Sequence, residues 1–451
     1  MDSNDSGVEG MTFKYSTSPL TGNRVPVIIE GARSPFVKSF GAFAECDALE
    51  LFSRTIDGLV RKADIPVDAY EEIICGVVTP QVKNTNVARD AILNLGLPYH
   101  IHGYSLNRMC TSSLETISNA AKSVMAGQAR MILAGGVDVL SDVPVTYTRE
   151  ARRALLRLNK AKSTGDKVSA IGSFIPKALA PKAPGITEPL TGMSMGEHAE
   201  IMAKLNGISR QDQDAFAVLS HQRAAAAQES GKFRREIVPI WPSPSFTTCV
   251  EKDNIIRPDT TLEGLSQIRP AFDRKYGTIT AGNASALTDG AAAVVIADEA
   301  HARNLGLKPK ARIRDVVFVG VNPYEQLLIG PALTIPMILM RNKLGITDID
   351  LFEIHEAFAA QVLSCLRSME STDFCSRHLG LASGFGSIPQ EKINVNGGAI
   401  AIGHPFGATG ARLLTSMTNE LQVRKGKFGV IAICAAGGMS GAMLVEMIEG
   451  A

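Results

Sequence analysis

Four side chains have types and surroundings that could carry out chemistry together. Cys110 lies in NRMCTSS, directly before an amphipathic helical pattern, and Cys434 lies in AICAAGGMSG, where a strand-like run ends. His404 lies in NGGAIAIGHPFGATGAR and His355 lies in HEAFAAQ. A thiol combined with an imidazole base is a frequent arrangement in covalent catalysis, so these segments indicate nucleophilic chemistry through sulfur.

The surroundings of the two sulfurs favour reactivity. A thiol at a helix N-terminus experiences the helix dipole and unpaired amides, which lower its pKa, so we expect a reactive thiolate at Cys110. A cysteine taken at random is more often an inert core residue. The small residues that follow Cys434 favour a turn with exposed backbone N–H groups, which an oxyanion site requires.

The two histidines differ in their surroundings. His404 lies in a Gly-rich turn, which leaves room for a substrate and lets the imidazole project into a cleft. A lone histidine is otherwise more often structural. His355 precedes Glu356, and such a pair could bind a metal, but no H-x-x-x-H motif or cysteine partner accompanies it. The sequence therefore favours a site without a metal.

The motifs together resemble those of the thiolase family. NRMCTSS, TAGNASALTDGAAA, HEAFAAQ, NVNGGAIAIGHPFGATGAR and CAAGGMSGAM occur in the family's order, and the similarity runs from about Arg24 to Glu449. HEAF and DVLSDVPVTYTREARRALL are similar to the thiolase (β) subunit of the fatty-acid-oxidation trifunctional complex and its bacterial relatives. Many other thiolases carry Asn where this chain has His355, so here an imidazole could occupy that role directly.

The resemblance implies a role for each of these side chains. Cys110 is expected to be the nucleophile that forms an acyl-thioester, and His404 the base that takes its proton. Cys434 is expected to act as the general acid and base. The backbone N–H groups of Cys110 and Ala436 are expected to form one oxyanion hole, and His404 with His355 a second one.

The implied reaction cleaves a 3-ketoacyl-CoA with CoA to acetyl-CoA and a shortened acyl-CoA. CoA is then a substrate, and no cofactor or metal is expected. The family's substrate and CoA contacts carry over, more weakly, to Ser285, Ala281, Met195, Phe358 and Arg257. Ordinary core packing explains Met195 and Phe358 about equally well.

Other functions stay open at this point. An acetyl-CoA acetyltransferase that condenses two acetyl-CoA molecules would use the same residues. A decarboxylating ketoacyl synthase fits less well, because its relatives lack the second catalytic cysteine that CAAGG supplies. A non-catalytic acyl-CoA-binding or lipid-binding relative would have little reason to keep Cys110, His404 and Cys434.

The elements that must position these residues follow a strand–loop–helix rhythm. Residues 25–32 read as a strand and 48–63 as a helix with apolar residues at 3.6-residue spacing. A strand, a helix that begins next to a reactive residue, and a strand that ends in Ala-Gly-Gly occur in both halves of the chain. Two related α/β halves would therefore place both helix starts near one cleft.

This organisation predicts an α/β protein, and the resemblance implies the thiolase fold, in which two related α/β halves form a layered αβαβα arrangement with an inserted loop domain. We expect a flexible lead-in over 1–23, an N-terminal half over 24–146 and 268–303, an insertion over 147–267, and a C-terminal half over 304–451. Long insertions in α/β enzymes usually shape substrate binding.

Composition limits the partners. The 451 residues carry a net charge of +1, which gives no reason to expect nucleic acid binding. The segment 148–167 is a basic amphipathic stretch that could contact a membrane surface or a partner subunit, although a solvated helix is equally compatible. The resemblance adds a homodimer or higher oligomer and a hydratase/dehydrogenase α subunit.

The chain's cysteines and N-terminus bear on its compartment. Seven cysteines without a C-x-x-C pair favour a reducing compartment. MDSNDSGVEG has neither an apolar signal core nor an Arg-rich transit pattern. The predicted location is therefore the cytoplasm, with the mitochondrion as the alternative.

Overall fold

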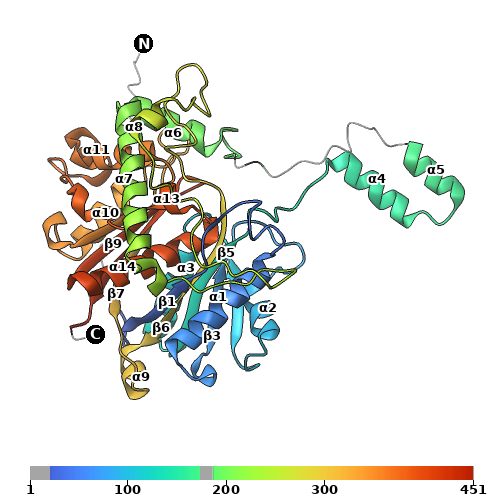
Figure 1. The fold of residues 1–451 in the computed structure, drawn as a ribbon, viewed down its shortest axis with the longest axis horizontal. Helices are drawn as coiled ribbons and strands as arrows, with labels where there is room; N and C mark the ends of the chain where they lie inside the picture. The colour runs from blue at the N-terminus through green and yellow to red at the C-terminus, as the bar shows by residue number, and fades with distance from the viewer. Residues whose placement is uncertain (1–20, 173–184, 186, 450–451) are drawn as a thin grey trace, which may run out of the picture.

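The computed structural model describes residues 21–172, 185 and 187–449, so nearly all of the predicted lead-in over 1–23 lies outside the described residues. In the described part, one sheet of ten strands has the order β4-β3-β5-β6-β1-β7-β10-β9-β8, with β2 beside β6 (Figure 1). The strands are β1 (Pro26–Arg33), β2 (Val37–Lys38), β3 (Glu72–Gly76), β4 (His102–Leu106), β5 (Met131–Asp138), β6 (Thr288–Asp298), β7 (Ala311–Gly320), β8 (Leu351–Ile354), β9 (Phe428–Ala435) and β10 (Met439–Met447).

The α-helices lie between these strands along the chain, as the α/β pattern predicts, with α4 to α8 between β5 and β6 and α11 to α14 between β8 and β9. They are α1 (Ala48–Ala63), α2 (Val87–Asn94), α3 (Ser112–Met125), α4 (Arg149–Lys160), α5 (Thr164–Gly172), α6 (Met195–Leu205), α7 (Arg210–Glu229), α8 (Leu262–Ser266), α9 (Glu299–Asn304), α10 (Pro331–Arg341), α11 (Ala359–Glu370), α12 (Thr372–Leu379), α13 (Ala399–Ile402) and α14 (Thr409–Arg424).

The two halves repeat one strand pattern. In the N-terminal half, β3 is parallel to β5, β5 is antiparallel to β6, and β6 is antiparallel to β1. In the C-terminal half, β8, β9, β10 and β7 have the same relations in the same order. Helix α3 leads into β5 as α14 leads into β9, and β1 and β7 join the halves. The predicted duplication is confirmed.

Successive side chains along each strand point to opposite faces of the sheet, and this separates the hydrophobic core into layers. In β9, Ile431 and Ile433 belong to the central core that also holds α3 and α14, whereas Val430 and Ala432 face an outer core. Helices α1 and α2 cover the outer face of the N-terminal half, and α10 and α11 cover that of the C-terminal half. Each half of the sheet forms one layer, so the order is helix, sheet, helix, sheet, helix, as predicted from the resemblance.

The segment predicted as an insertion contains two structurally different parts. Helices α4 and α5 extend away from the body of the molecule (Figure 1), whereas α6 and α7 pack on α11 and α13. The basic segment 148–167 is not a single helix: α4 ends at Lys160, and α5 begins at Thr164 with an interruption between them. The boundaries of an inserted domain over 147–267 stay a prediction.

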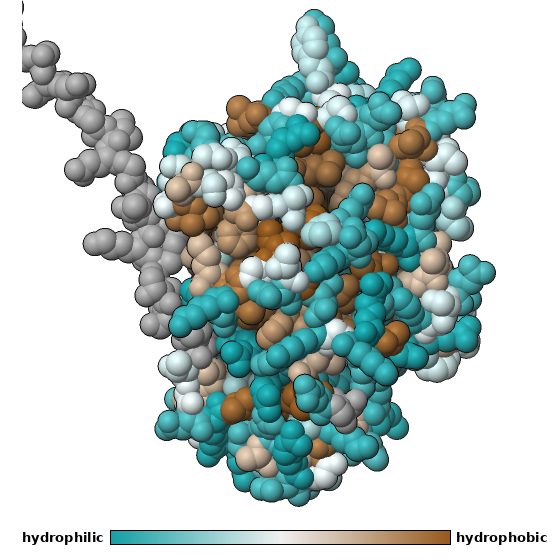
Figure 2. All heavy atoms as spheres, turned by 90° about the vertical axis from the view of Figure 1, so that its left-hand side faces the viewer, coloured by the Kyte–Doolittle hydropathy of each residue, from teal (hydrophilic) through white to brown (hydrophobic). Residues whose placement is uncertain are grey.

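The surface is mixed in character. Figure 2 shows the side of the molecule that carries α10 and α11, where hydrophobic residues gather in the middle and hydrophilic residues border them.

Within the described ranges, each helix is too short or too polar to cross a bilayer. All seven cysteines of the sequence lie in the described part and are free.

Candidate active site

A tight turn between β4 and α3 presents Cys110. Met109 has a φ of 49°, a left-handed conformation that is strained for a side chain without a local polar contact. The Ser112 hydroxyl closes the turn by accepting the Arg108 N–H at 2.8 Å and donating to the Met109 carbonyl at 2.6 Å. Cys110 therefore projects from the turn that immediately precedes α3, as predicted.

Cys434 lies one residue before the end of β9, next to a three-residue turn into β10. Gly437 and Gly438 have φ values of 78° and 63°, and such consecutive left-handed residues make a tight hairpin turn at little cost when they are glycines. Cys434 is 1% exposed, and the turn begins with Ala436. Small residues therefore leave the backbone of the turn open toward the site.

The turn and the nucleophile meet at the sulfur of Cys110. The backbone N–H groups of Ala436 and of Cys110 itself lie near this sulfur and favour its thiolate form. These are the two amides predicted for the first oxyanion hole. Burial acts in the opposite direction and is the larger influence, so the pKa of Cys110 is raised to about 12. The predicted lowering of this pKa by the helix terminus was therefore wrong.

His404 lies between α13 and α14. Its backbone N–H donates to the Ala286 carbonyl at 3.2 Å, and its Nδ1 lies 2.6 Å from the Thr409 hydroxyl oxygen. The other ring nitrogen, Nε2, is buried and has no hydrogen-bond partner among the described residues. Burial, with a smaller contribution from Arg412, lowers the pKa of His404 to about 3. The imidazole is neutral at physiological pH and can accept a proton.

His355 directly follows β8 and faces His404. The centroids of the two rings are 4.1 Å apart, and the ring planes are inclined by 48°. Burial, followed by the charges of His404 and Arg412, lowers the pKa of His355 well below its usual value. Both of its ring nitrogens are buried without a hydrogen-bond partner in the described part of the chain. A neutral imidazole with an unused N–H is suited to bind an oxygen of a substrate.

Glu356 has a structural environment. Its carboxylate accepts hydrogen bonds from the Ser220 hydroxyl and the Asn394 amide, both at 2.7 Å, and from the Ile400 N–H at 3.2 Å. Through these hydrogen bonds, the Glu356 carboxylate fixes the end of β8, next to His355. Within the described residues, no group of three His, Cys, Asp or Glu side chains is placed to hold a metal ion.

The starts of α3 and α14 bring the two halves together. The Ala411 N–H of α14 donates to the Ser113 hydroxyl of α3 at 3.0 Å. Asp138, at the end of β5, accepts the Gly407 N–H at 2.5 Å next to the His404 turn. Cys110 raises the pKa of Cys434, which burial already places well above its usual value. The structure thus brings Cys110 near Cys434 and His404 near His355, and the helices that follow Cys110 and His404 contact each other at the junction of the halves.

The predicted substrate contacts divide into two groups. Ser285 lies between the two histidine segments: its N–H donates to the Ala357 carbonyl at 3.0 Å, and the flanking residues 284 and 287 pair with Phe358 and His404. Met195 packs against the core cluster that contains Phe358. Arg257 instead lies toward α7, where its N–H donates to His221 Nδ1 at 3.2 Å.

Ala281 is exposed at a turn between Thr280 and Gly282. The structure therefore places Ser285 and Phe358 next to the histidine segments, Met195 against the core that contains Phe358, Arg257 beside α7 and Ala281 at an exposed turn.

Sequence reasoning missed several residues that shape the site. Glu188, in the Pro-rich stretch, accepts the Gly437 N–H at 2.9 Å and so anchors the turn beside Cys434. Thr409 contacts His404, and Asp138 holds the neighbouring turn. The GGVD end of a buried strand could have indicated Asp138, because polar groups at strand ends often hold adjacent loops. No local signal marks Glu188.

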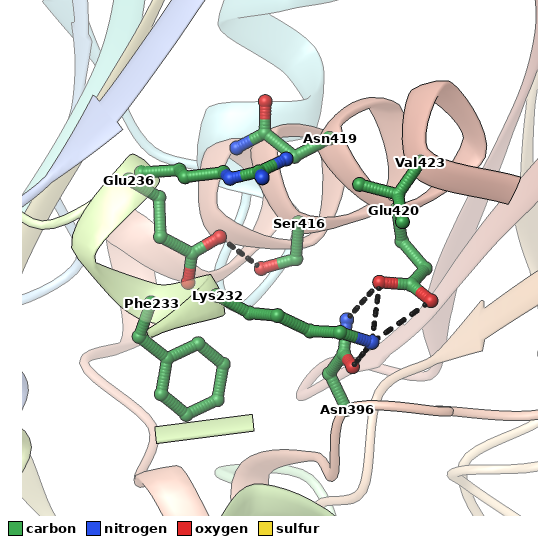
Figure 3. Close-up of a pocket in the computed structure, with 9 residues that line it drawn as sticks. Lys232, Phe233, Glu236, Asn396, Ser416, Asn419, Glu420 and Val423 are labelled. Atoms are coloured by element: carbon green, nitrogen blue, oxygen red, sulfur yellow. Dashed lines mark hydrogen bonds and ion pairs between the residues drawn. The ribbon is translucent and has the colours of Figure 1, made fainter. Parts of the chain in front are cut away.

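A second concave region lies away from these residues. Figure 3 shows the side chains that line a hollow between α14 and the segment that follows α7. Its volume is about 10 Å³. The Lys232 ammonium binds Asn396 and Glu420, and Glu236 accepts the Ser416 hydroxyl at 2.9 Å. These side chains satisfy one another and leave space for about one water molecule. The hollow is a structural junction.

The duplicated fold, with a pair of cysteines and a pair of facing imidazoles where its halves meet, defines a protein suited to nucleophilic chemistry through sulfur. Comparison with known families gives the particular family. Residues 26–300 match the family model "Thiolase, N-terminal domain" and residues 307–447 match "Thiolase, C-terminal domain". The chain belongs to the thiolase family.

Similar proteins cover almost the whole chain. A "Probable 3-ketoacyl-CoA thiolase" of Caenorhabditis elegans is 42% identical over 420 residues, which is 93% of each chain. A "3-ketoacyl-CoA thiolase" of Klebsiella pneumoniae (strain 342) is 40% identical, over 94% of this chain and 97% of that protein.

Two crystal structures extend the comparison. The acetyl-CoA acetyltransferase of Bacillus anthracis has 33% identity and a TM-score of 0.79, over 95% of this chain and all (100%) of the other. The human mitochondrial 3-ketoacyl-CoA thiolase in complex with CoA has 29% identity and a TM-score of 0.81, over 96% of this chain and 100% of the other.

Proposed function

We propose that this protein is a 3-ketoacyl-CoA thiolase, an acyltransferase that cleaves a 3-ketoacyl-CoA with CoA to acetyl-CoA and an acyl-CoA shortened by two carbons. The observation that supports the proposal is a site at the junction of the halves, where two backbone N–H groups lie at the Cys110 sulfur and where the rings of His404 and His355 face each other beside a helix that contacts α3. The similarity to 3-ketoacyl-CoA thiolases over more than nine-tenths of the chain supports it.

In the first half-reaction, His404 Nε2 takes the proton of Cys110 and the sulfur attacks the 3-keto carbon. The N–H groups of Cys110 and Ala436 stabilise the resulting oxyanion. The bond between carbons 2 and 3 breaks, which leaves the acyl group on Cys110 and releases the acetyl-CoA enolate. Cys434 protonates the enolate carbon, a step that its raised pKa permits because the thiol is neutral beforehand.

The second half-reaction returns each proton. The Cys434 thiolate takes the proton of the incoming CoA thiol, and the CoA sulfur attacks the acyl-thioester. Acyl-CoA leaves, and the Cys110 thiolate recovers its proton from the His404 imidazolium. His355 and the protonated His404 bind the thioester oxygen on which the enolate charge develops. Each hydrogen bond of this kind contributes on the order of a hundredfold to the rate.

The proposal is tested by mass spectrometry of the Cys110 peptide after incubation with 3-ketoacyl-CoAs of short and long chain. We expect an acyl group on Cys110 that disappears when CoA is added, with acetyl-CoA as a product. Cys110→Ala should abolish both signals, and Cys249→Ala, which removes an exposed cysteine, should leave them unchanged. Turnover in the Cys110→Ala variant, or acylation elsewhere, would contradict the proposal.

A second candidate is the condensation of two acetyl-CoA molecules by the same residues. The similarity to the Bacillus anthracis acetyl-CoA acetyltransferase supports this reading. Steady-state kinetics distinguishes the two candidate functions. A degradative enzyme should have a higher kcat/KM for long-chain than for four-carbon 3-ketoacyl-CoA, and an acetyltransferase should have a higher kcat/KM for the four-carbon substrate. A non-catalytic acyl-CoA-binding role predicts binding without turnover in the same assay.

The α4–α5 arm is the basis of a proposal about partners. Arg152, Arg153 and Arg157 are exposed on α4, and Leu155 and Leu156 beside them are 38% and 60% exposed. Exposed leucines among arginines suit an anionic membrane surface or an acidic partner. We propose that this arm contacts a membrane surface or a hydratase/dehydrogenase α subunit, and that the protein forms a homodimer or higher oligomer in the cytoplasm or, alternatively, the mitochondrion.

Charge reversal tests the role of the arm. Replacement of Arg152, Arg153 and Arg157 by Glu should abolish co-sedimentation with vesicles that contain anionic lipid, or association with the α subunit. A matched variant with three exposed basic residues of the body replaced by Glu should keep it; these are Arg61, Arg234 and Lys252. Unchanged binding by the folded arm variant would refute the proposal, and size-exclusion chromatography with light scattering measures the oligomeric state.

A further inference from the structure

The Thr409 hydroxyl, at the first residue of α14, contacts two groups in the turn before it. Its oxygen lies 2.6 Å from His404 Nδ1 and 3.1 Å from the Pro405 carbonyl oxygen. Thr409 is fully buried and His404 is 4% exposed, so water does not compete for these bonds. Each contact is short enough to be a hydrogen bond, and together they restrict where the protons can be.

The two contacts together favour one proton arrangement. A carbonyl oxygen accepts and cannot donate, so the Thr409 proton is directed to Pro405, as in the usual bond from a helical threonine to the carbonyl four residues earlier. The threonine oxygen then accepts a proton from His404 Nδ1. The reverse arrangement would place two oxygen lone pairs 3.1 Å apart in a buried site.

We infer that Thr409 is a positioning residue, which holds the proton of His404 on Nδ1 and thereby keeps Nε2 free to take the proton of Cys110. This inference deepens the proposed function, on which it rests for the role of His404. It agrees with the absence of any partner for Nε2 among the described residues. The base is prepared in the resting enzyme, before substrate arrives.

The same bond stabilises the charged state that catalysis requires. When Nε2 takes the thiol proton, the imidazolium has two N–H donors, and Nδ1–H already has its acceptor in Thr409. Without the hydroxyl, Nδ1–H would remain buried and unpaired, and the other tautomer, which offers a donor to the thiol, would become available. The ring would then also lose the contact that fixes its orientation.

The test compares variants at this position with a matched control on the same helix. Thr409→Val keeps the shape and removes the hydroxyl, whereas Thr409→Ser keeps the hydroxyl. Thr409→Ala removes the hydroxyl with a smaller side chain and replaces the valine variant if that variant does not fold. Thr418→Val removes another buried hydroxyl of α14, which donates to the Leu414 carbonyl at 2.9 Å, and serves as the control.

We expect Thr409→Val to lower kcat by about 10- to 100-fold, the usual effect of removing a partner that orients a reacting group, with KM for 3-ketoacyl-CoA changed by less than about twofold. Thr409→Ser should restore most of the activity, and Thr418→Val should match the unmodified protein. A wild-type kcat for Thr409→Val, or an equal loss for Thr409→Ser, would overturn the inference.

A second measurement separates this inference from the proposed function. The rate at which iodoacetamide alkylates Cys110 depends on the base next to the sulfur and needs no CoA substrate. We expect Thr409→Val to slow the alkylation of Cys110 and Thr418→Val to leave it unchanged. If the unmodified protein does not turn over 3-ketoacyl-CoA, the proposed function fails while this comparison still decides the role of Thr409; equal alkylation rates would refute it.

Discussion

The surroundings of Cys110 and His404 favour the neutral form of both side chains, and this determines how the nucleophile must be activated. Burial raises the pKa of the Cys110 thiol to about 12 and lowers the pKa of the His404 imidazole to about 3. A preformed thiolate–imidazolium pair is therefore disfavoured, because both charges would be poorly solvated. The proton must move to His404 as the sulfur attacks, which is general-base catalysis.

This proton transfer predicts a distinctive pH profile. Between pH 5 and 9, alkylation of Cys110 by iodoacetamide should be nearly independent of pH, because His404 is neutral above its pKa of about 3 and assists at every pH in this range. In His404→Gln the reaction must proceed through the free thiolate. Its rate should then rise about tenfold per pH unit, because the pKa of about 12 lies above the range.

Cys249 provides an internal control for this experiment, since it is exposed and its alkylation should rise with pH in both proteins. Peptide mass spectrometry separates the two cysteines. A steep profile for Cys110 in the unmodified protein would show that the thiolate forms without help from His404 and would contradict the general-base mechanism.

The candidate site residues could be identified from the sequence, but their protonation states could not. Cys110, His404, Cys434 and His355 lie in motifs whose order and residue types are local properties of the chain. The pKa of Cys110 depends on the whole layer of protein around it, so the helix-terminus argument gave the wrong direction. Thr409 is five residues after His404 and could have been found from the helix start in ATGAR. The burial of Cys110 could not have been predicted from the sequence around it.

Among the elements, the β9–β10 turn has the greatest influence on the site, and a distant segment holds it. Glu188 is 7% exposed and accepts the Gly437 N–H at 2.9 Å, next to the Ala436 amide that contacts the Cys110 sulfur. Two adjacent left-handed glycines make the turn intrinsically flexible. The Glu188 bond therefore fixes the direction of the Ala436 N–H.

Removal of this anchor should impair catalysis more than binding. We expect Glu188→Ala to reduce kcat about tenfold or more while the melting temperature changes little, because an oxyanion donor loses its orientation. Glu188→Gln retains an acceptor oxygen and should retain most of the activity. Steady-state kinetics with 3-ketoacyl-CoA measures both, and Glu251→Ala, at an exposed position, is the control. Equal kcat values for Glu188→Ala and Glu251→Ala would exclude the anchor.

Elements with strong local patterns could be predicted, and elements held by distant contacts could not. The apolar spacing of residues 48–63 predicts a helix, and α1 occupies that range. The basic segment 148–167 has few buried residues, so its sequence has no continuous apolar face that would mark where a helix ends. The interruption between α4 and α5 was therefore not predicted. The Glu188 contact joins residues 249 positions apart, a separation that no local pattern encodes.

At the scale of the whole molecule, a buried charge cluster connects the first strand to the segment predicted as an insertion. Arg33 of β1 donates to Glu236 at 2.8 Å and to both oxygens of Asp253 at 2.7 and 2.8 Å. Arg33 is fully buried, and the two carboxylates are 3% and 4% exposed. Glu236 also accepts the Ser416 hydroxyl of α14, at the hollow shown in Figure 3.

This cluster should make the predicted insertion part of one cooperative unit with the N-terminal half. We expect Arg33→Leu to lower the free energy of unfolding by about 3–5 kcal/mol, because two buried carboxylates lose their cation. Urea unfolding of the intact protein measures this loss. Arg61→Leu removes an arginine that pairs with Asp57 on the surface of α1 and should leave the midpoint unchanged. A similar midpoint for both variants would mean that the cluster does not hold the segment to the body, and the segment would then unfold on its own, before the layered core.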